Sequence, residues 1–242
     1  MKKLFEKSEI TVAIIWIVIY TVGIGNLRTL GDDSPVLMLG LLVLSLLIIL
    51  FVRMTDTAAY YGLKGWVSDN KAMLWLIPLY IVSSTNLWAG ISPNYPMPGL
   101  LYASVMMACV GFVEEMIFRG FLFKAMLKDS KAITAVVVSS VTFGMGHIVN
   151  LFIGQELAET LLQIVFAVVI GFIFTMVFYK GGSLWPCILA HSFIDVASLF
   201  SVEKSPELRQ ATYIVVLALA VFYCLYLAKR VKTAQINMTI RQ

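Results

Sequence analysis

Residues 98–123 read PGLLYASVMMACVGFVEEMIFRGFLF, an apolar stretch interrupted by the charged residues Glu114, Glu115 and Arg119. A helix needs roughly 20 apolar residues to cross about 30 Å of hydrocarbon, and this stretch is long enough to do so. We therefore expect a membrane-spanning helix here. Two carboxylates and a guanidinium inside such a helix need a specific explanation, because charged groups are costly in hydrocarbon.

The rest of the chain has the composition of a membrane protein. Of its 242 residues, 60% are hydrophobic and 13% are charged, and the mean hydropathy is +0.89. Soluble domains have about 25% charged and 45–50% apolar residues. We expect an all-α, polytopic integral membrane protein in which residues 1–242 form a single transmembrane domain. The three cysteines form no CxxC motif, so they indicate neither a metal nor a redox site.

The apolar segments predict about eight transmembrane helices, taking roughly 17 residues as the lower limit. The segments lie at residues 10–27, 35–52, 72–88, 98–123, 132–150, 157–179, 183–200 and 211–228. The first segment follows Met-Lys-Lys, but it is longer than the apolar part of a secretory signal and no Ala-x-Ala site follows it. We expect this segment to be retained as the first span.

The distribution of Lys and Arg predicts the orientation of the helices. With eight spans, fourteen of the 18 basic residues lie on the side that holds both termini. Arg28, Lys204 and Arg209 lie on the other side, and Arg119 lies within a span. Because loops rich in Lys and Arg remain cytoplasmic, both termini are expected in the cytoplasm. The net charge of +4 then reflects the lipid bilayer and does not indicate a nucleic-acid partner.

Six ionisable residues fall within predicted spans. They are Glu114, Glu115 and Arg119 in the span at 98–123, His147 in the span at 132–150, and His191 and Asp195 in the span at 183–200. Each costs at least about 2.5–3.5 kcal/mol at a helix centre, so an ionisable residue inside the membrane indicates a functional site by default. Six such residues on three helices predict one polar site where the helices converge.

The spacing of these residues suggests how they pair. Glu115 and Arg119 are four apart and can form a charge-assisted pair on one helix face. Glu114 is rotated by about 100° from Glu115. It has no basic partner in its own span, so its partner must be His147 or His191. Asp195 is four residues from His191 and can fix the tautomer of its imidazole.

Three motifs carry a resemblance to a known family. They are Glu114-Glu115-x-x-x-Arg119, Phe143-x-x-x-His147 and His191-x-x-x-Asp195. In this order on successive spans, they resemble the CPBP intramembrane endopeptidases, which include type II CAAX prenyl proteases and bacterial Abi or bacteriocin-processing proteins. The resemblance implies eight transmembrane helices around a conical cavity that opens to the membrane and the cytoplasm, with peptide-bond hydrolysis inside it. The motif-bearing core covers about residues 98–200.

The resemblance also implies roles for the residues. Glu114 and His147 would activate the attacking water, while Glu115 and Arg119 would support the site. His191 and Asp195 would stabilise the oxyanion. Many family members have Asn at the last position, and an ionised Asp195 cannot donate to an oxyanion as an amide does. Asp195 would then orient His191, or it would remain protonated in the low-dielectric site.

Two other catalytic mechanisms remain open. Glu114, His147 and His191 could supply three ligands to a catalytic zinc ion with an open position, although no HExxH motif supports this. Cys187 is four residues before His191 and could form a Cys–His nucleophilic pair. An inert, buried thiol is the simpler interpretation of Cys187. We therefore expect no cofactor, with zinc as the alternative.

Two non-proteolytic functions are also compatible with the polar cluster. A proton- or cation-coupled transporter could use the same Glu, His and Asp side chains, although no inverted repeat is visible. A non-catalytic immunity or scaffold protein could keep the cluster for assembly alone, and Glu115 with Arg119 could be a structural clamp. We favour an intramembrane endopeptidase that acts on a membrane-associated peptide or protein, in a bacterial cell membrane.

Overall fold

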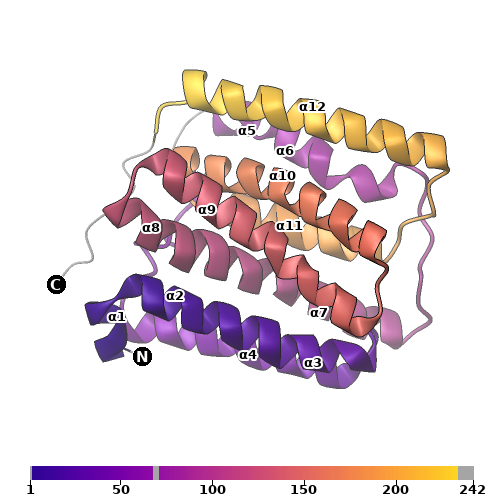
Figure 1. The fold of residues 1–242 in the computed structure, drawn as a ribbon, viewed down its shortest axis with the longest axis horizontal. Coiled ribbons are helices and arrows are strands. Elements are labelled where there is room, and N and C mark those ends of the chain that lie inside the picture. The colour runs from indigo at the N-terminus through magenta and orange to yellow at the C-terminus, as the bar shows by residue number, and fades with distance from the viewer. Residues whose placement is uncertain (1, 68–70, 234–242) are drawn as a thin grey trace.

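The structure, a computed structural model, describes residues 2–67 and 71–233, and this part of the chain is all-α. Its long helices lie side by side along one direction (Figure 1). The helical segments are α1 (Lys2–Lys7), α2 (Glu9–Val18), η1 (Ile19–Ile24), α3 (Gly25–Leu27), η2 (Arg28–Leu30), α4 (Pro35–Met54), α5 (Ala72–Trp75), α6 (Ile77–Ser83), η3 (Thr85–Leu87), α7 (Gly99–Glu115), η4 (Met116–Phe123), α8 (Lys124–Asp129), α9 (Ala132–Met145), η5 (Gly146–Ile153), α10 (Leu157–Gly181), α11 (Trp185–Ser198) and α12 (Pro206–Arg230).

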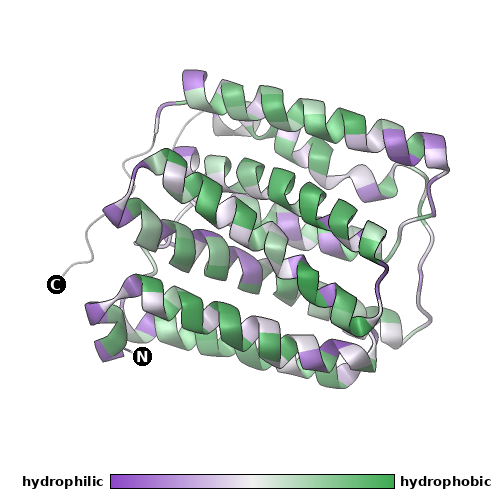
Figure 2. Cartoon of the chain, viewed as in Figure 1, coloured by the Kyte–Doolittle hydropathy of each residue, from purple (hydrophilic) through white to green (hydrophobic). Residues whose placement is uncertain are grey.

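Six of the eight predicted spans are continuous helices that are long and apolar enough to cross a membrane. They are Glu9–Leu30, Pro35–Met54, Gly99–Asp129, Ala132–Ile153, Leu157–Gly181 and Pro206–Arg230. Apolar residues cover most of their length, and hydrophilic residues gather towards their ends (Figure 2). Many large apolar side chains of these helices face outward, as expected for helices in contact with lipid.

The two remaining predicted spans are shorter than expected. Residues 72–88 are divided into α5, α6 and η3, and Pro78 lies in the first turn of α6, where its missing N–H ends the preceding helical turn. Helix α11 has 14 residues and is therefore about 21 Å long, less than the thickness of the hydrocarbon. Both segments pack against neighbouring helices, α11 against α7, α10 and α6, and α6 also against α12.

The helices alternate in direction between two ends of the bundle. Helix α1, the loop at residues 55–67, α8 and the last turn of α12 lie at one end, on the left in Figure 1. We call this the terminal end. The loops at residues 31–34, 154–156 and 199–205 lie at the other end, which we call the opposite end.

A close contact between α7 and α11 positions the polar site. A Cβ atom added to Gly111 would lie 2.5 Å from the backbone nitrogen of Ser192, so only glycine permits this approach. The Ser192 hydroxyl donates to the carbonyl of Ala108 at 2.9 Å and links the two helices. As a result, Glu114 and Glu115, one turn further along α7, lie beside His191.

Candidate active site

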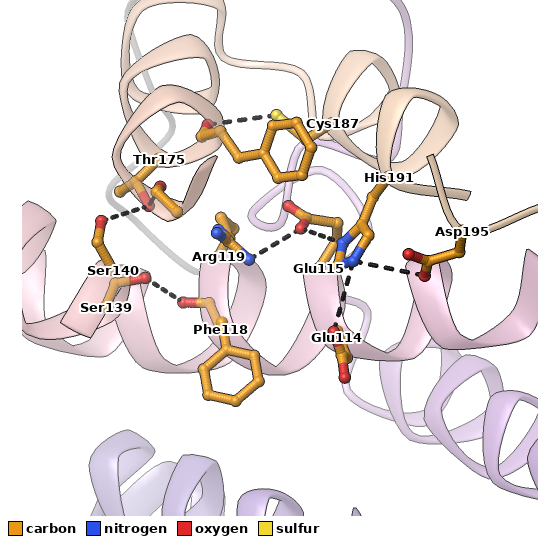
Figure 3. Close-up of polar contacts among 12 residues, drawn as sticks. Glu114, Glu115, Phe118, Arg119, Ser139, Ser140, Thr175, Cys187, His191 and Asp195 are labelled. Atoms are coloured by element: carbon orange, nitrogen blue, oxygen red, sulfur yellow. Dashed lines mark hydrogen bonds and ion pairs between the residues drawn. The ribbon is translucent and has the colours of Figure 1, made fainter. Parts of the chain in front are cut away.

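Three carboxylates surround the imidazole of His191 (Figure 3). Its Nδ1 is 2.8 Å from Oε1 of Glu115. A carboxylate only accepts hydrogen bonds, so the Nδ1–H donates to Glu115. The Nε2 atom of His191 is 3.5 Å from a carboxylate oxygen of Glu114 and 3.5 Å from one of Asp195. The structure therefore brings four of the six predicted site residues into one cluster.

Arg119 forms the predicted pair with Glu115. Its Nη1 donates to Oε1 of Glu115 at 2.8 Å, and both side chains are completely buried. The guanidinium lies 4.2 Å from the ring centroid of Phe143 and 5.4 Å from that of Phe174, so aromatic faces replace water around it. The same oxygen of Glu115 thus contacts Arg119 and His191, and this links the ion pair to the imidazole.

Glu114 has a partner that the sequence analysis missed. The hydroxyl of Tyr20, on the π-helix η1, donates to Oε1 of Glu114, while the other carboxylate oxygen of Glu114 faces His191. A tyrosine in an apolar span gives no motif that points to a site 94 positions away. Single π-helical turns are frequent at functional sites, but they are not visible in hydropathy.

His147 lies across the site from His191, and Phe143 lies between them. The ring centroid of Phe143 is 5.7 Å from that of His147 and 5.5 Å from that of His191, with near-perpendicular planes. Among the described residues, no direct hydrogen bond to His147 is found. His147 and Glu114 both line the same two cavities. The expected neighbour of Glu114 on another helix is therefore His191, and His147 faces it across open space.

Two adjoining cavities connect these residues. The smaller has a volume of about 30 Å³ and is lined by Tyr20, Glu114 and His147 among others. The larger has a volume of about 360 Å³ and is lined by Arg28, Asp32, Met107, Val110, Glu114, His147, Asn150, Ile153, Gln155, Gln163, His191, Asp195 and Ser198. Four residues line both: Arg28, Glu114, His147 and Asn150. Arg28, counted as a loop residue from sequence, thus belongs to the wall of the site.

One wall of the larger cavity is a row of amides. The side-chain amide of Asn150 donates to Gln163 at 2.8 Å, and that of Gln155 donates to the same oxygen at 3.1 Å. Within residues 2–67 and 71–233, the buried Oδ1 of Asn150 has no hydrogen-bond partner.

The structure also bears on the two other catalytic mechanisms. The thiol of Cys187 is buried and donates to the carbonyl of Phe174 at 3.3 Å, as expected for a structural cysteine. Across the described ranges, no group of three His, Cys, Asp or Glu side chains could hold a metal ion. The geometry thus gives no support to a zinc site, and the absence of a metal in the reaction stays a prediction.

Comparisons with known proteins agree with the position of this cluster. Residues 96–197 match the family model described as Type II CAAX prenyl endopeptidase Rce1-like. No curated protein and no solved structure matched the chain. The matched segment contains all six predicted site residues, while Tyr20 and Arg28 precede it.

Proposed function

We propose that this chain, whose residues 96–197 are an Rce1-like type II CAAX prenyl endopeptidase family domain, hydrolyses a peptide bond in a membrane-associated peptide or protein. Membership of this family implies a peptidase with a peptide or protein substrate. The single transmembrane domain would place hydrolysis within the membrane, with the catalytic core at about residues 98–200 and with α11 and the segment α5–η3 completing eight crossings.

The observation that carries this proposal is the small cavity between Glu114 and His147. Its volume of about 30 Å³ exceeds the roughly 10–15 Å³ that one water molecule needs, and Tyr20, Glu114 and His147 supply polar groups on its wall. Glu114 is held there by the hydroxyl of Tyr20 and faces the larger cavity as well. A water in the small cavity would be within reach of an acid or base and adjacent to space for a peptide.

Hydrolysis then follows from these positions. Glu114 takes a proton from the water, and the hydroxide oxygen bonds to the carbonyl carbon of the scissile peptide while the π electrons move to the carbonyl oxygen. The C–N bond breaks as the tetrahedral intermediate collapses, and the leaving amine takes the proton from Glu114. His147, on the same cavity wall, would share or relay this proton.

The oxyanion would be stabilised from the side of α11. Nδ1 of His191 is held by Glu115, so Nε2 is directed towards Glu114, Asp195 and the larger cavity. Because Nδ1–H donates to Glu115, Nε2 carries a hydrogen only when the imidazole is protonated, a form that the three surrounding carboxylates favour. The Nε2–H of this imidazolium would stabilise developing negative charge without reorganisation. Asp195, four residues from His191, would orient the imidazole, and Arg119 would hold Glu115 in place.

The proposal is tested by comparing the termini of membrane peptides from cells that produce the wild-type chain, Glu114→Gln or Glu203→Gln. Glu203 is the matched control because its side chain is 92% exposed and lines neither of the two cavities. New peptide termini are expected with the wild type and with Glu203→Gln, and they should be absent with Glu114→Gln. Equal cleavage by Glu114→Gln would refute a role for this carboxylate. A change in ion flux without cleavage would favour the transporter.

A further inference from the structure

The larger cavity opens towards the opposite end of the bundle. Its deepest lining residues, Glu114 and His191, lie in the middle of the membrane segments. Its outer lining residues include Asp32, Gln155 and Ser198, which are partly exposed and lie in or next to the loops at the opposite end. Every residue that lines this cavity lies between the cluster and these loops.

The terminal end of the bundle is closed by protein. All eight residues of η4, which continue from Glu115 towards the terminal end, are buried. The loop at residues 55–67 folds over the start of α11, where the backbone N–H of Leu184 donates to the carbonyl of Gly62 at 3.0 Å. In the same loop, the ring of Tyr61 lies 5.1 Å from that of Phe121 and is buried. Within the part of the chain that the structure describes, no cavity therefore leads a peptide from this end to His191.

The two ends also differ in charge. At the opposite end, the described basic residues are Arg28, Lys204 and Arg209. At the terminal end, thirteen basic residues are described: Lys2, Lys3, Lys7, Arg53, Lys64, Lys71, Lys124, Lys128, Lys131, Lys180, Lys229, Arg230 and Lys232. Arg241, the fourteenth basic residue assigned to this side from the sequence, lies outside the described residues. Short loops rich in Lys and Arg stay on the cytoplasmic side of a membrane.

These observations conflict with one expectation from the family resemblance. A cavity open to the cytoplasm and termini in the cytoplasm require the mouth and the termini to share one side, but they lie at opposite ends of the bundle. From the charge difference, we infer that the catalytic cavity of this chain opens to the extracytoplasmic side. This inference rests on the proposed function only in calling the cavity catalytic. The side of the membrane to which the cavity opens does not depend on the reaction.

The direction of the cavity limits the class of substrate. A peptide tail on the cytoplasmic surface would face η4 and the loop at residues 55–67, and it would have to cross the bilayer to reach Glu114. A segment that has already crossed the membrane enters the cavity directly past Gln155 and Ser198. The substrate is therefore an extracytoplasmic segment of a membrane-associated peptide or protein.

The inference is tested with single-cysteine variants of the protein, labelled in spheroplasts. Cys109, Cys187 and Cys224 are first changed to Ala, and the folded yield of this background is checked. Glu203→Cys then reports the opposite end, and Gln155→Cys reports the cavity mouth. Lys64→Cys is the matched control, because the Lys64 side chain is 63% exposed at the terminal end.

A membrane-impermeant maleimide is added before and after lysis of the spheroplasts. We expect full labelling of Glu203→Cys and Gln155→Cys before lysis, and labelling of Lys64→Cys only after lysis. The reverse pattern overturns the inference. It is also overturned if Glu203→Cys is labelled before lysis while Gln155→Cys is labelled only after lysis or not at all, because the mouth would then not open on that side. Labelling does not depend on cleavage, so each result is separate from the test of the peptidase.

Discussion

Replacing Glu115 or Arg119 is expected to show that the two residues act as one buried unit. They are 2.8 Å apart and neither side chain is exposed. Removing one partner of such a pair leaves an uncompensated buried charge and costs about 3–5 kcal/mol. We expect Glu115→Gln to cost this amount, because Arg119 would keep only its contacts with aromatic rings. Arg119→Met should cost less, because Glu115 keeps the hydrogen bond from His191.

The double variant separates structure from chemistry. It removes both charges, so its loss of stability should be smaller than the sum of the single losses, by about 1–3 kcal/mol. Its activity should stay low, however, because His191 has still lost the carboxylate that accepts from its Nδ1. A recovery of stability without a recovery of cleavage is the result expected of a pair that also positions an imidazole.

The free energy of unfolding is measured by reversible unfolding in mixed detergent micelles, and cleavage is measured on the same preparations. The matched control is the exposed pair Glu203 and Arg209, whose atoms are 4.0 Å apart and whose coupling should stay below about 1 kcal/mol. Losses for Glu115 and Arg119 that add within about 0.5 kcal/mol would contradict the interaction. Cleavage that recovers together with stability would reduce the pair to a structural clamp.

Four further predictions concern the site. Glu114→Ala and His147→Ala should each lower the cleavage rate by about 10² to 10⁴ without loss of thermal stability, while Cys187→Ala should change it little, because the thiol contacts only protein. Tyr20→Phe should lower the cleavage rate, because Glu114 loses a hydrogen-bond donor; an unchanged rate would mean that Tyr20 only fills space. Gly111→Ala should lower both folded yield and cleavage by separating α7 from α11, whereas Gly23→Ala, with open space at its Cβ position, should be neutral. Metal analysis of active protein should find no stoichiometric zinc; zinc that is lost with activity and restored with it would make Glu114 and the histidines ligands.

The sequence predicted those parts of the site that depend on local spacing. The pair of Glu115 and Arg119 and the contact of His191 with Asp195 both join residues four apart on one helix, and the structure contains both. Convergence of the cluster was also predictable, because buried charges in hydrocarbon need partners and few were available. Six of the spans followed in the same way from length and hydropathy.

Features that depend on packing between distant segments were not predictable. The contact between Tyr20 and Glu114 joins η1 to α7, and neither residue belongs to a pattern that indicates the other. Arg28 was assigned to a loop because the apolar segment ends with Leu27. The helical segment continues, however, through η2 to Leu30. The length of α11 also differed: the helix has 14 residues, fewer than the predicted span at 183–200.

The helical segment Glu9–Leu30 contributes to the site, so the residues that match the family model do not form the whole site. Residues 96–197 supply Glu114, His147 and His191, but Tyr20 donates to Glu114 from outside this range. Arg28, also outside, lines both cavities together with Glu114. Helix α2 packs against η4, and the stacked rings of Trp16 and Phe121, 6.0 Å apart, hold it there. A chain reduced to about residues 98–200 would therefore keep every predicted catalytic side chain, yet it would lose one wall of the cavity and the hydroxyl that fixes the proposed base.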